Sequence, residues 1–237
     1  MKLFLDTLIK KWPEYLLESI VIFGSILGAI SMENWNEERK ERAFEQKMLA
    51  ELQVSLTRDI RDLNFNIKMH KEAMQSQRRI IEWLDSDENM NDSLCYDFGK
   101  SNYWTVFIRN SGTYETLKST GITLITNDSL RKAISYLYEM KYDFHDEIES
   151  QYNSMLKQKW EAIDDQFFSN SFVDSDNPML LANCMQPTNL TGLRSSNPYR
   201  YNLENMIELN QLFIREMEVS KNRATRIIEI IDNIYNE

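Results

Sequence analysis

Glycine and proline are scarce in this sequence of 237 residues, which contains six of the first and four of the second. Both residues mark the turns of sheet proteins and interrupt helices, so their scarcity argues against a fold made of many short strands. The chain is instead rich in methionine, leucine, isoleucine, glutamate and lysine. This composition predicts an all-α fold built from long helices.

Cysteine is also scarce, and it occurs only as Cys95 and Cys184. Their separation matches neither a Cys-x-x-Cys pair nor the spacing of a zinc site. Two interpretations stay open on this evidence, a single disulfide or two free thiols.

Histidine occurs twice, as His70 and His145. Neither belongs to an HExxH pattern, so we interpret both as core-edge or exposed side chains, with a pH-sensitive or metal-binding pair as the alternative. The sequence also lacks a glycine-rich phosphate loop and a GxSxG elbow. It therefore predicts no catalytic activity, no cofactor and no metal site.

Positive charge is in deficit, because 27 lysine and arginine residues face 37 aspartate and glutamate residues, for a net charge of −10. A nucleic-acid-binding protein needs a basic surface that displaces counterions from phosphates. An anionic membrane surface attracts basic segments in the same way. The charge therefore disfavours nucleic acid as a partner, and it gives the soluble part no general attraction to anionic lipid.

One long hydrophobic run is present, at residues 15–32, and Glu18 is its single ionisable residue. As a helix, this run would measure roughly 27 Å, close to the thickness of a bilayer's hydrocarbon core. We predict a transmembrane helix over residues 14–32 that uses membrane lipid as its surroundings. A buried core helix and an uncleaved signal sequence are the alternatives.

The flanks of this run support the prediction. Trp12 and Tyr15 lie at its beginning and Trp35 lies beyond its end, and such aromatic residues anchor helices at membrane–water interfaces. Residues 1–13 combine apolar and basic side chains, and they read as an amphipathic lead-in that lies in the interface plane. We expect Pro13 to break the helix between this lead-in and the span.

Two features of the span point beyond anchoring. Gly24, Ser25, Gly28 and Ala29 form overlapping small-xxx-small pairs, which let helix backbones approach closely in lipid and predict a homo-oligomer. Glu18 is costly in hydrocarbon, although its position near the interface lowers this cost. It is read as neutralised or solvated by headgroups, and a polar stripe lining an oligomeric pore is the alternative.

Residues 33–237 are predicted to form one helical-bundle domain. No glycine or proline lies between Met32 and Leu84, and the apolar positions there repeat every 3.5 residues, as in a coiled coil. The predicted seam is Leu49, Leu52, Leu56, Ile60, Leu63, Ile67, His70, Met74, Gln77, Ile81 and Leu84.

Two further long helices are predicted, over residues 129–168 and 202–235. Packing their apolar stripes against the first helix in an antiparallel bundle would bury all three. The predicted seam of the earlier helix is Leu130, Ile134, Leu137, Lys141, Phe144, Ile148, Tyr152, Met155 and Ile163. That of the later helix is Leu203, Met206, Asn210, Phe213, Met217, Ser220, Ala224, Ile227, Ile231 and Ile234.

The connections are less regular. A short helix over residues 113–120 is predicted to end at Gly121, and Asn127 is predicted to cap the helix that follows. Any sheet is expected to be no more than a hairpin near 103–108 or 122–126. Residues 169–201 are expected to form a folded loop, a lid or a tether. A candidate partner surface in that loop combines Phe172, Met179, Leu180 and Leu181.

Two blocks of the sequence carry a resemblance. Residues 18–52 place Glu18 in the span, Gly28 and Ala29 near its end, and Asn34, Trp35, Asn36 and Glu37 just after it. Residues 114–127 read YETLKSTGITLITN. Both blocks resemble an uncharacterised family of bacterial single-pass membrane proteins, although Met32 and Glu33 depart from its usual pattern. The resemblance implies a membrane span and a helical domain, and no activity.

Together these features predict a membrane-anchored helical-bundle interaction or sensing module that self-associates, binds a possible protein partner and is not an enzyme. An oligomeric pore-forming or membrane-disrupting effector is the alternative. We expect a single pass through a bacterial inner membrane. The positive charges on the two sides of the span nearly balance, and the short basic leader favours an extracytoplasmic bundle by a small margin.

Overall fold

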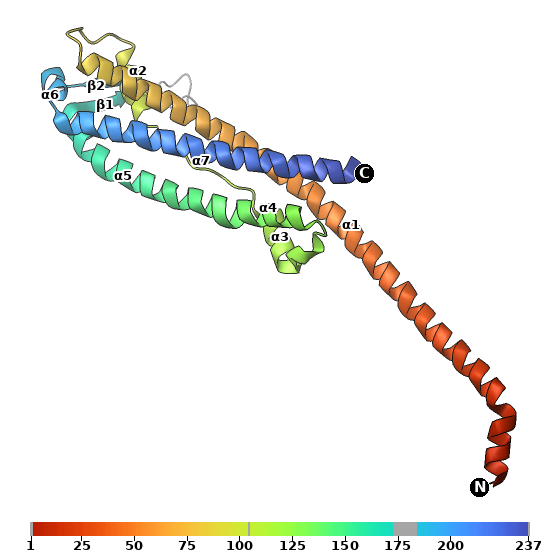
Figure 1. Ribbon diagram of the computed structural model, residues 1–237. Coiled ribbons are helices and arrows are strands. Elements are labelled where there is room, and N and C mark those ends of the chain that lie inside the picture. The colour runs from red at the N-terminus through yellow and green to blue at the C-terminus, as the bar shows by residue number, and fades with distance from the viewer. Residues whose placement is uncertain (1, 104, 173–183, 237) are drawn as a thin grey trace. The chain divides into compact units, whose positions relative to one another are not determined.

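The structure is a computed structural model, and it describes residues 2–103, 105–172 and 184–236. Side-chain surroundings are described for the same residues except 2–11, 155–162, 164–165, 169–172 and 235–236. The chain divides into two compact units, Met1–Leu49 and Ala50–Glu237. The fold is all-α, with a single two-stranded sheet among the described residues (Figure 1).

Helix α1, Lys2–Leu84, is the longest element, with 83 residues. It continues past Trp35 without interruption, as expected for a segment that has no glycine or proline after the span. It also continues through Pro13, so the predicted break at that residue is wrong. A proline inside a helix removes one backbone hydrogen bond, and the helix-forming residues on both sides keep the remaining ones.

The second unit is a bundle of three long helical segments. They are the part of α1 after residue 49, the segment formed by α4 (Asp128–Tyr136), the π-helix η2 (Leu137–Tyr142) and α5 (Asp143–Phe167), and helix α7 (Asn197–Asn236). In Figure 1, α5 and α7 lie side by side within this unit. The prediction of a helical bundle is confirmed.

Side-chain pairs establish the directions of the helices. Helix α7 is antiparallel to α1, because residues early in one bind residues late in the other, and it is antiparallel to α5 for the same reason. Helices α1 and α5 are therefore parallel to each other. The prediction of an antiparallel bundle did not say which pair of helices would be parallel. The pairs are Gln53–Asp232, His70–Asn210 and Asp85–Arg200 for α1 and the residue after it, and Lys141–Glu216 and Tyr152–Asn210 for η2 and α5.

The seam of α7 lies where the sequence predicts it. Every predicted position from Leu203 to Ile231 is buried, and only the last, Ile234, is exposed, at 36%. The seam of α1 is wider than predicted. Asp59, Ala73 and Ile80 are fully buried, whereas the predicted positions Ile60, Met74 and Ile81 are half-buried. Helix α1 is covered on two sides of its axis, so one coiled-coil stripe does not describe it.

The seam of α5 is displaced by one residue along its first half. The structure buries Tyr142, His145 and Glu149 where the repeat predicts Lys141, Phe144 and Ile148. Phe144 is 46% exposed, so its assignment to the core is wrong. The π-helix accounts for the displacement, because its i→i+5 hydrogen bonds insert an extra residue into the helix and shift the positions that directly follow. Tyr152 is buried in both assignments.

The elements that connect α1 to α4 are short. They are α2 (Leu94–Ser101), α3 (Gly112–Thr120) and the 3₁₀-helix η1 (Ile122–Leu124). Gly121 ends α3 at φ 115°, a conformation that side-chain-bearing residues rarely adopt, and Asn127 accepts a hydrogen bond from the N–H of Leu130 at 3.0 Å. Both predictions for these residues are confirmed.

The hairpin lies elsewhere than predicted. Strands β1 (Phe168–Phe172) and β2 (Cys184–Pro187) pair antiparallel, and the short helix α6 (Leu190–Arg194) follows them. The described residues of 103–108 and 122–126 contain no strand. Apolar, β-branched residues do not make a strand on their own, because a strand also needs a partner edge.

Candidate functional site

The first feature that bears on function is the apolar part of α1. Among the described residues, it is the one stretch long and apolar enough to cross a membrane, and none of it is buried within the protein. The predicted anchors Trp12, Tyr15 and Trp35 are all exposed. Gly24 and Gly28 have open space beside them, because no heavy atom lies within 4 Å of the position that a Cβ would take. A second helix could therefore approach the backbone closely at these positions.

A buried polar layer crosses the bundle near the middle of the second unit. The amide of Asn210, on α7, is its centre. Asn210 Nδ2 donates to Gln77 Oε1 at 3.1 Å, and Asn210 Oδ1 accepts from Tyr152 at 3.2 Å. Gln77 in turn donates to the carbonyl of Ser101 at 2.8 Å. The layer therefore links α1, α2, α5 and α7 through hydrogen bonds.

His70 belongs to the same layer, and its neighbours define its tautomer. Its Nδ1 lies 2.7 Å from Asn210 Oδ1, which is an acceptor, so Nδ1 carries the proton. Its Nε2 then accepts from the hydroxyl of Thr105 at 3.0 Å. The ring stacks on Phe213, with centroids 5.2 Å apart. Burial lowers the pKa of His70, while the bond to Asn210 opposes this effect.

His145 lies on α5 and bonds a different partner. Its Nε2 is 2.9 Å from the hydroxyl of Ser220, beside the Lys141–Glu216 ion pair. Burial lowers the pKa of His145. The interpretation of the two histidines as core-edge or exposed side chains is wrong, because each is buried inside the bundle. Within the described residues, no group of three histidine, cysteine or acidic side chains is placed to hold a metal ion.

The second polar feature is the connection between α2 and α3. Its residues 105–110, here called the strap, are in neither a helix nor a strand, and side chains of α1, η2 and α5 hold them. The N–H of Phe107 donates to Glu149 at 3.0 Å, and that of Ile108 donates to Asp62 at 2.9 Å. Asn110 donates from both its backbone N–H and its amide to Asp59 Oδ1, at 2.7 and 2.8 Å.

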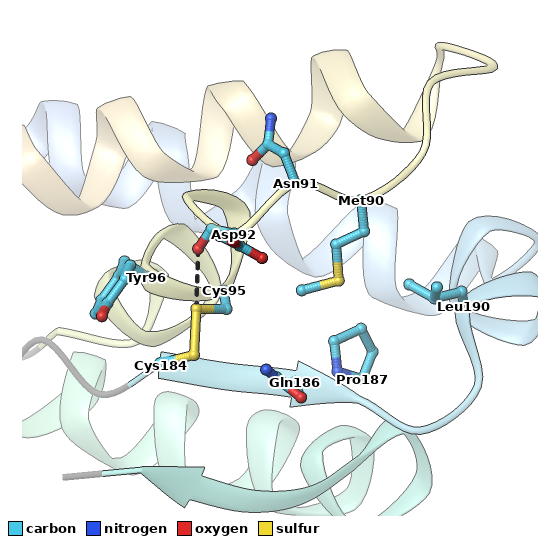
Figure 2. Close-up of a pocket in the computed structure, with 9 residues that line it drawn as sticks. All are labelled: Met90, Asn91, Asp92, Cys95, Tyr96, Cys184, Gln186, Pro187 and Leu190. Carbon is cyan, nitrogen blue, oxygen red and sulfur yellow. Dashed lines mark hydrogen bonds between the residues drawn. A yellow bond between two sulfur atoms is a disulfide. The ribbon is translucent and has the colours of Figure 1, made fainter. Parts of the chain in front are cut away.

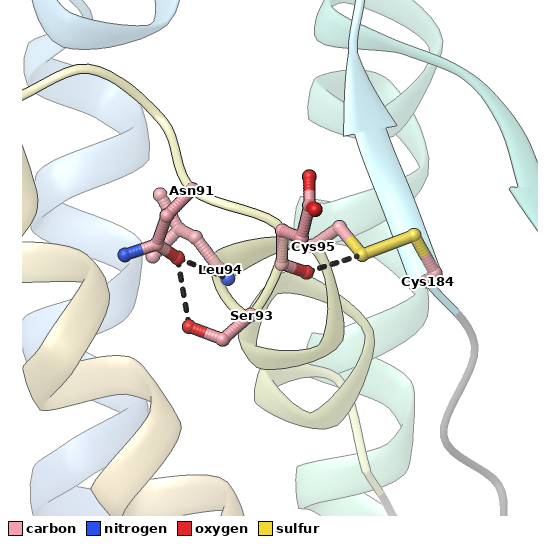
Figure 3. The surroundings of a disulfide bond; sticks show 6 residues. Asn91, Ser93, Leu94, Cys95 and Cys184 are labelled. Atoms are coloured by element: carbon pink, nitrogen blue, oxygen red, sulfur yellow. Dashed lines mark hydrogen bonds between the residues drawn. A yellow bond between two sulfur atoms is a disulfide. The ribbon is translucent and has the colours of Figure 1, made fainter.

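At the end of the bundle, Cys95 of α2 and Cys184 of β2 form a disulfide, with their Cα atoms 4.7 Å apart (Figure 3). This resolves the alternative that the sequence leaves open. The bond joins positions separated by 89 residues, and it ties the hairpin to α2. Asn91 Oδ1 accepts from the N–H of Leu94 at 3.0 Å and so fixes the start of α2.

A pocket of about 550 Å³ opens beside this disulfide (Figure 2). The loop before α2 and the strand β2 form its walls, and the side chains of both cysteines line it. Asp92 is the one charged side chain in its lining. The lining residues are Met90, Asn91, Asp92, Cys95, Tyr96, Cys184, Gln186, Pro187 and Leu190.

The predicted partner surface lies largely outside the described residues. Met179, Leu180 and Leu181 belong to that part of the chain, and Phe172 is described only as the last backbone position of β1. The carboxylates that hold the strap, in contrast, were not predicted. Asp59 and Asp62 read as ordinary charges on a helix, and only their position three residues apart beside a seam could have drawn attention to them.

Comparison with known proteins identifies the family to which the chain belongs. A model described as "Family of unknown function (DUF6090)" matches residues 18–171. The chain belongs to this family. The matched part runs from Glu18 in the apolar stretch to Ser171 in β1, so β2, α6 and α7 follow it. No curated protein and no solved structure matches the chain.

Proposed function

We propose that this member of the family is a bacterial single-pass membrane protein whose helical domain is a non-catalytic interaction or sensing module. The observation that carries the proposal is the exposed apolar stretch of α1, which has aromatic residues at both ends and continues directly into the helix of the bundle. A single helix, α1, therefore supplies both the span and one helix of the domain. It is suited to present a domain at a membrane or to pass a change in one to the other.

The proposal includes self-association through the span. In lipid, helices associate where small residues let their backbones approach, and Gly24, Ser25, Gly28 and Ala29 provide such a face. The hydroxyl of Ser25 donates to the carbonyl of Val21 at 2.7 Å, so this polar group is satisfied within its own helix. It can pack against a second copy at no cost in lost hydrogen bonds.

The non-catalytic part of the proposal rests on how the polar groups are used. The buried His70, His145 and Asn210 are engaged in bonds that hold helices together. An active site instead presents its titratable groups to a cavity that substrate can enter. The pocket beside the disulfide is lined by one charged residue, Asp92, which gives no pair of groups for acid–base chemistry.

We place the bundle on the extracytoplasmic side of the inner membrane. The disulfide supports this side, because such bonds form and persist in oxidising compartments and are rare in the cytosol. The short basic leader with Lys2, Lys10 and Lys11 supports the same direction, since positive segments stay in the cytoplasm.

Crosslinking in native membranes tests the self-association. Replacing Gly24 and Gly28 by leucine should abolish the crosslinked oligomer and leave the helical content unchanged, because the added side chains hold the backbones apart. Ser19→Leu is the matched control, since it lies on the opposite face of the same helix. Crosslinking of the double variant at the parental level would mean that the span is only an anchor.

Glu18 carries the alternative, an oligomeric pore. If the carboxylate lines a pore, Glu18→Gln should change ion flux through liposomes that contain the protein, because the charge would lie in the path of the ions. We expect no flux from either protein. Flux that depends on Glu18 would replace the interaction module with the pore.

A further inference from the structure

The strap is attached in an unusual way. Among the described residues, the backbone N–H groups of 105–110 make no hydrogen bond to another backbone group. Its contacts go to side chains on α1, η2 and α5, including the hydroxyl of Tyr138, which donates to the carbonyl of Asn110 at 3.4 Å. Thr105 binds His70 and Asn110 binds Asp59, so the six strap residues run beside the twelve residues 59–70 of α1 in the opposite direction. The strap at the rise of a strand and this part of α1 at the rise of a helix each cover about 17 Å.

Few apolar contacts hold the strap. Phe107 is buried, and its ring meets those of Tyr142 at 4.9 Å and His145 at 5.8 Å. The side chains on either side, Val106 and Ile108, point outward and are 46% and 69% exposed. One buried ring and a few side-chain hydrogen bonds make a weak attachment compared with a packed helix.

The charges around the strap do not balance. Asp59 and Asp62 face it from α1, and Glu149 faces it from α5. Arg109 is the one cation that the strap itself brings, and it is already paired with Asp143 at 2.7 Å and Asp146 at 3.3 Å. Glu115 of α3 adds a further negative charge near this arginine. The groups beneath the strap therefore carry an excess of negative charge.

Asp59 is the least compensated of these groups. Its side chain is fully buried, and its Oδ2 makes no hydrogen bond. The hydroxyl of Tyr142 faces the carboxylate as a potential donor and lowers its pKa, but the two groups are not placed for a well-formed hydrogen bond. Burial raises the pKa of Asp59, and the bonds from Asn110 do not fully offset this effect. A buried charge with an unpaired oxygen stores free energy that opening would release.

We propose that the strap detaches locally from α1 and α5 while the long helices stay packed, and that the negative charge beneath it sets how often it opens. Opening would bring water to the carboxylates and lower the cost of their charge. It would also uncover the aromatic slot that Phe107 occupies, between Tyr142 and His145. The strap is thus a movable cover on a slot inside the bundle.

The proposal predicts that acid favours the closed strap, whereas a simple loss of ion pairs in acid would favour the open one. Burial raises the pKa of Asp59, Asp146 and Glu149 in the closed state. The state with the higher pKa is favoured as pH falls, so protonation of these groups closes the strap. Among the other groups that face it, Tyr138 and Tyr142 stay neutral because burial raises the pKa of each.

Two histidines also face the strap, His70 through Thr105 and His145 against the ring of Phe107, and both act in the other direction. Burial lowers the pKa of each, so acid would charge them and oppose closure. The test is therefore made at one pH with carboxylate variants, so that the state of both histidines stays the same.

Hydrogen exchange of the full-length protein in lipid nanodiscs at pH 7.5 tests the proposal. Asp59→Asn keeps an oxygen for Asn110, removes the charge and offers an N–H to Tyr142. It should slow exchange in the peptide that contains residues 105–110 severalfold and leave the α7 peptides unchanged. Glu149→Gln should act in the same direction. Asp59→Ala, which removes the acceptor, should speed exchange of the strap.

Two results would overturn the proposal. If Asp59→Asn speeds strap exchange as much as Asp59→Ala does, the negative charge holds the strap closed. If the strap exchanges no faster than α7 in the parent protein, it opens only when the bundle unfolds. The alanine variant serves as the internal check, because its faster exchange with unchanged α7 peptides shows that the bundle still folds.

Discussion

The bundle contains two buried polar regions that differ in how completely they are paired. Around Asn210 the groups are neutral, and each bond satisfies both partners, as in Tyr152 to Asn210 and Asn210 to Gln77. Around Asp59 the groups are charged, and both an oxygen and the nearby hydroxyl of Tyr142 are left without a bond. A complete neutral network stabilises one arrangement, whereas an incomplete charged one stores free energy.

The difference has a structural origin. The layer around Asn210 joins elements that are packed along their length, so each side chain finds a fixed partner. The region around Asp59 instead holds an extended connection whose backbone needs acceptors, and carboxylates supply them. This arrangement satisfies the backbone of the strap and leaves the charge of the carboxylates uncompensated. We therefore expect the two regions to respond in opposite ways to removal of a polar group.

The largest effect is expected from Asn210→Ala. It removes the group shared by His70, Gln77 and Tyr152, and each of these would be buried without its partner. A buried polar group that loses its bond costs about 1–3 kcal/mol, so we expect a loss of at least about 3 kcal/mol in the free energy of unfolding. Urea titration of the detergent-solubilised protein measures it.

Asn222→Ala is the control for this variant, because Asn222 lies on the exposed side of the same helix. It should change stability by less than about 0.5 kcal/mol. Equal effects of the two substitutions would show that the layer around Asn210 contributes no more than helix propensity does.

Two tyrosines allow a smaller and sharper comparison. Tyr152→Phe removes a hydroxyl that donates to Asn210, and it should destabilise the protein by about 1 kcal/mol. Tyr142→Phe removes a buried hydroxyl that faces Asp59 without a well-formed hydrogen bond, and it should be neutral or stabilising by up to about 1 kcal/mol. Thermal unfolding of the two variants in parallel compares them directly. A loss of stability for Tyr142→Phe as large as that for Tyr152→Phe would contradict the proposed difference.

The smallest effect concerns pH. Burial lowers the pKa of His145 from its ordinary value of 6.5, so the stability that it contributes is present above pH 6.5 and is lost as pH falls through the lowered value. His145→Gln keeps a partner for Ser220 and should flatten the fall in stability on the acid side of pH 6.5. Unfolding curves at several pH values measure this slope. An unchanged slope in the variant would assign the acid sensitivity to other groups.

Periodicity predicted the helices and the seam of α7 because an unbroken α-helix keeps its register over its whole length. It did not predict the π-helix at residues 137–142, since one added residue leaves no mark in an apolar pattern. The resulting shift exposes Phe144 and buries His145 and Glu149. His145 binds Ser220, and Glu149 binds the strap. The shift that periodicity did not predict therefore placed two side chains of the candidate site.

The hairpin and the disulfide were beyond prediction for a different reason. Both depend on contacts between residues far apart in the sequence, such as Cys95 and Cys184, and local patterns carry no information on such pairs. The strap shows the same limit. Val106 and Ile108 look like one face of a strand, but the partners that hold this segment are carboxylates on two helices, one of which comes later in the chain.

The state of the two cysteines in living cells tests the central claim, a membrane-anchored domain outside the cytoplasm. Free thiols are first blocked with a maleimide in whole bacteria that express the full chain. The protein is then extracted and reduced, and newly exposed thiols are tagged with a reagent that increases their mass. The account predicts that Cys95 and Cys184 are tagged only after reduction, and that the Cys184 thiol of Cys95→Ser reacts with an impermeant maleimide in spheroplasts. Blocking of both cysteines in the first step, with no reaction in spheroplasts, would place the domain in the cytoplasm and contradict the account.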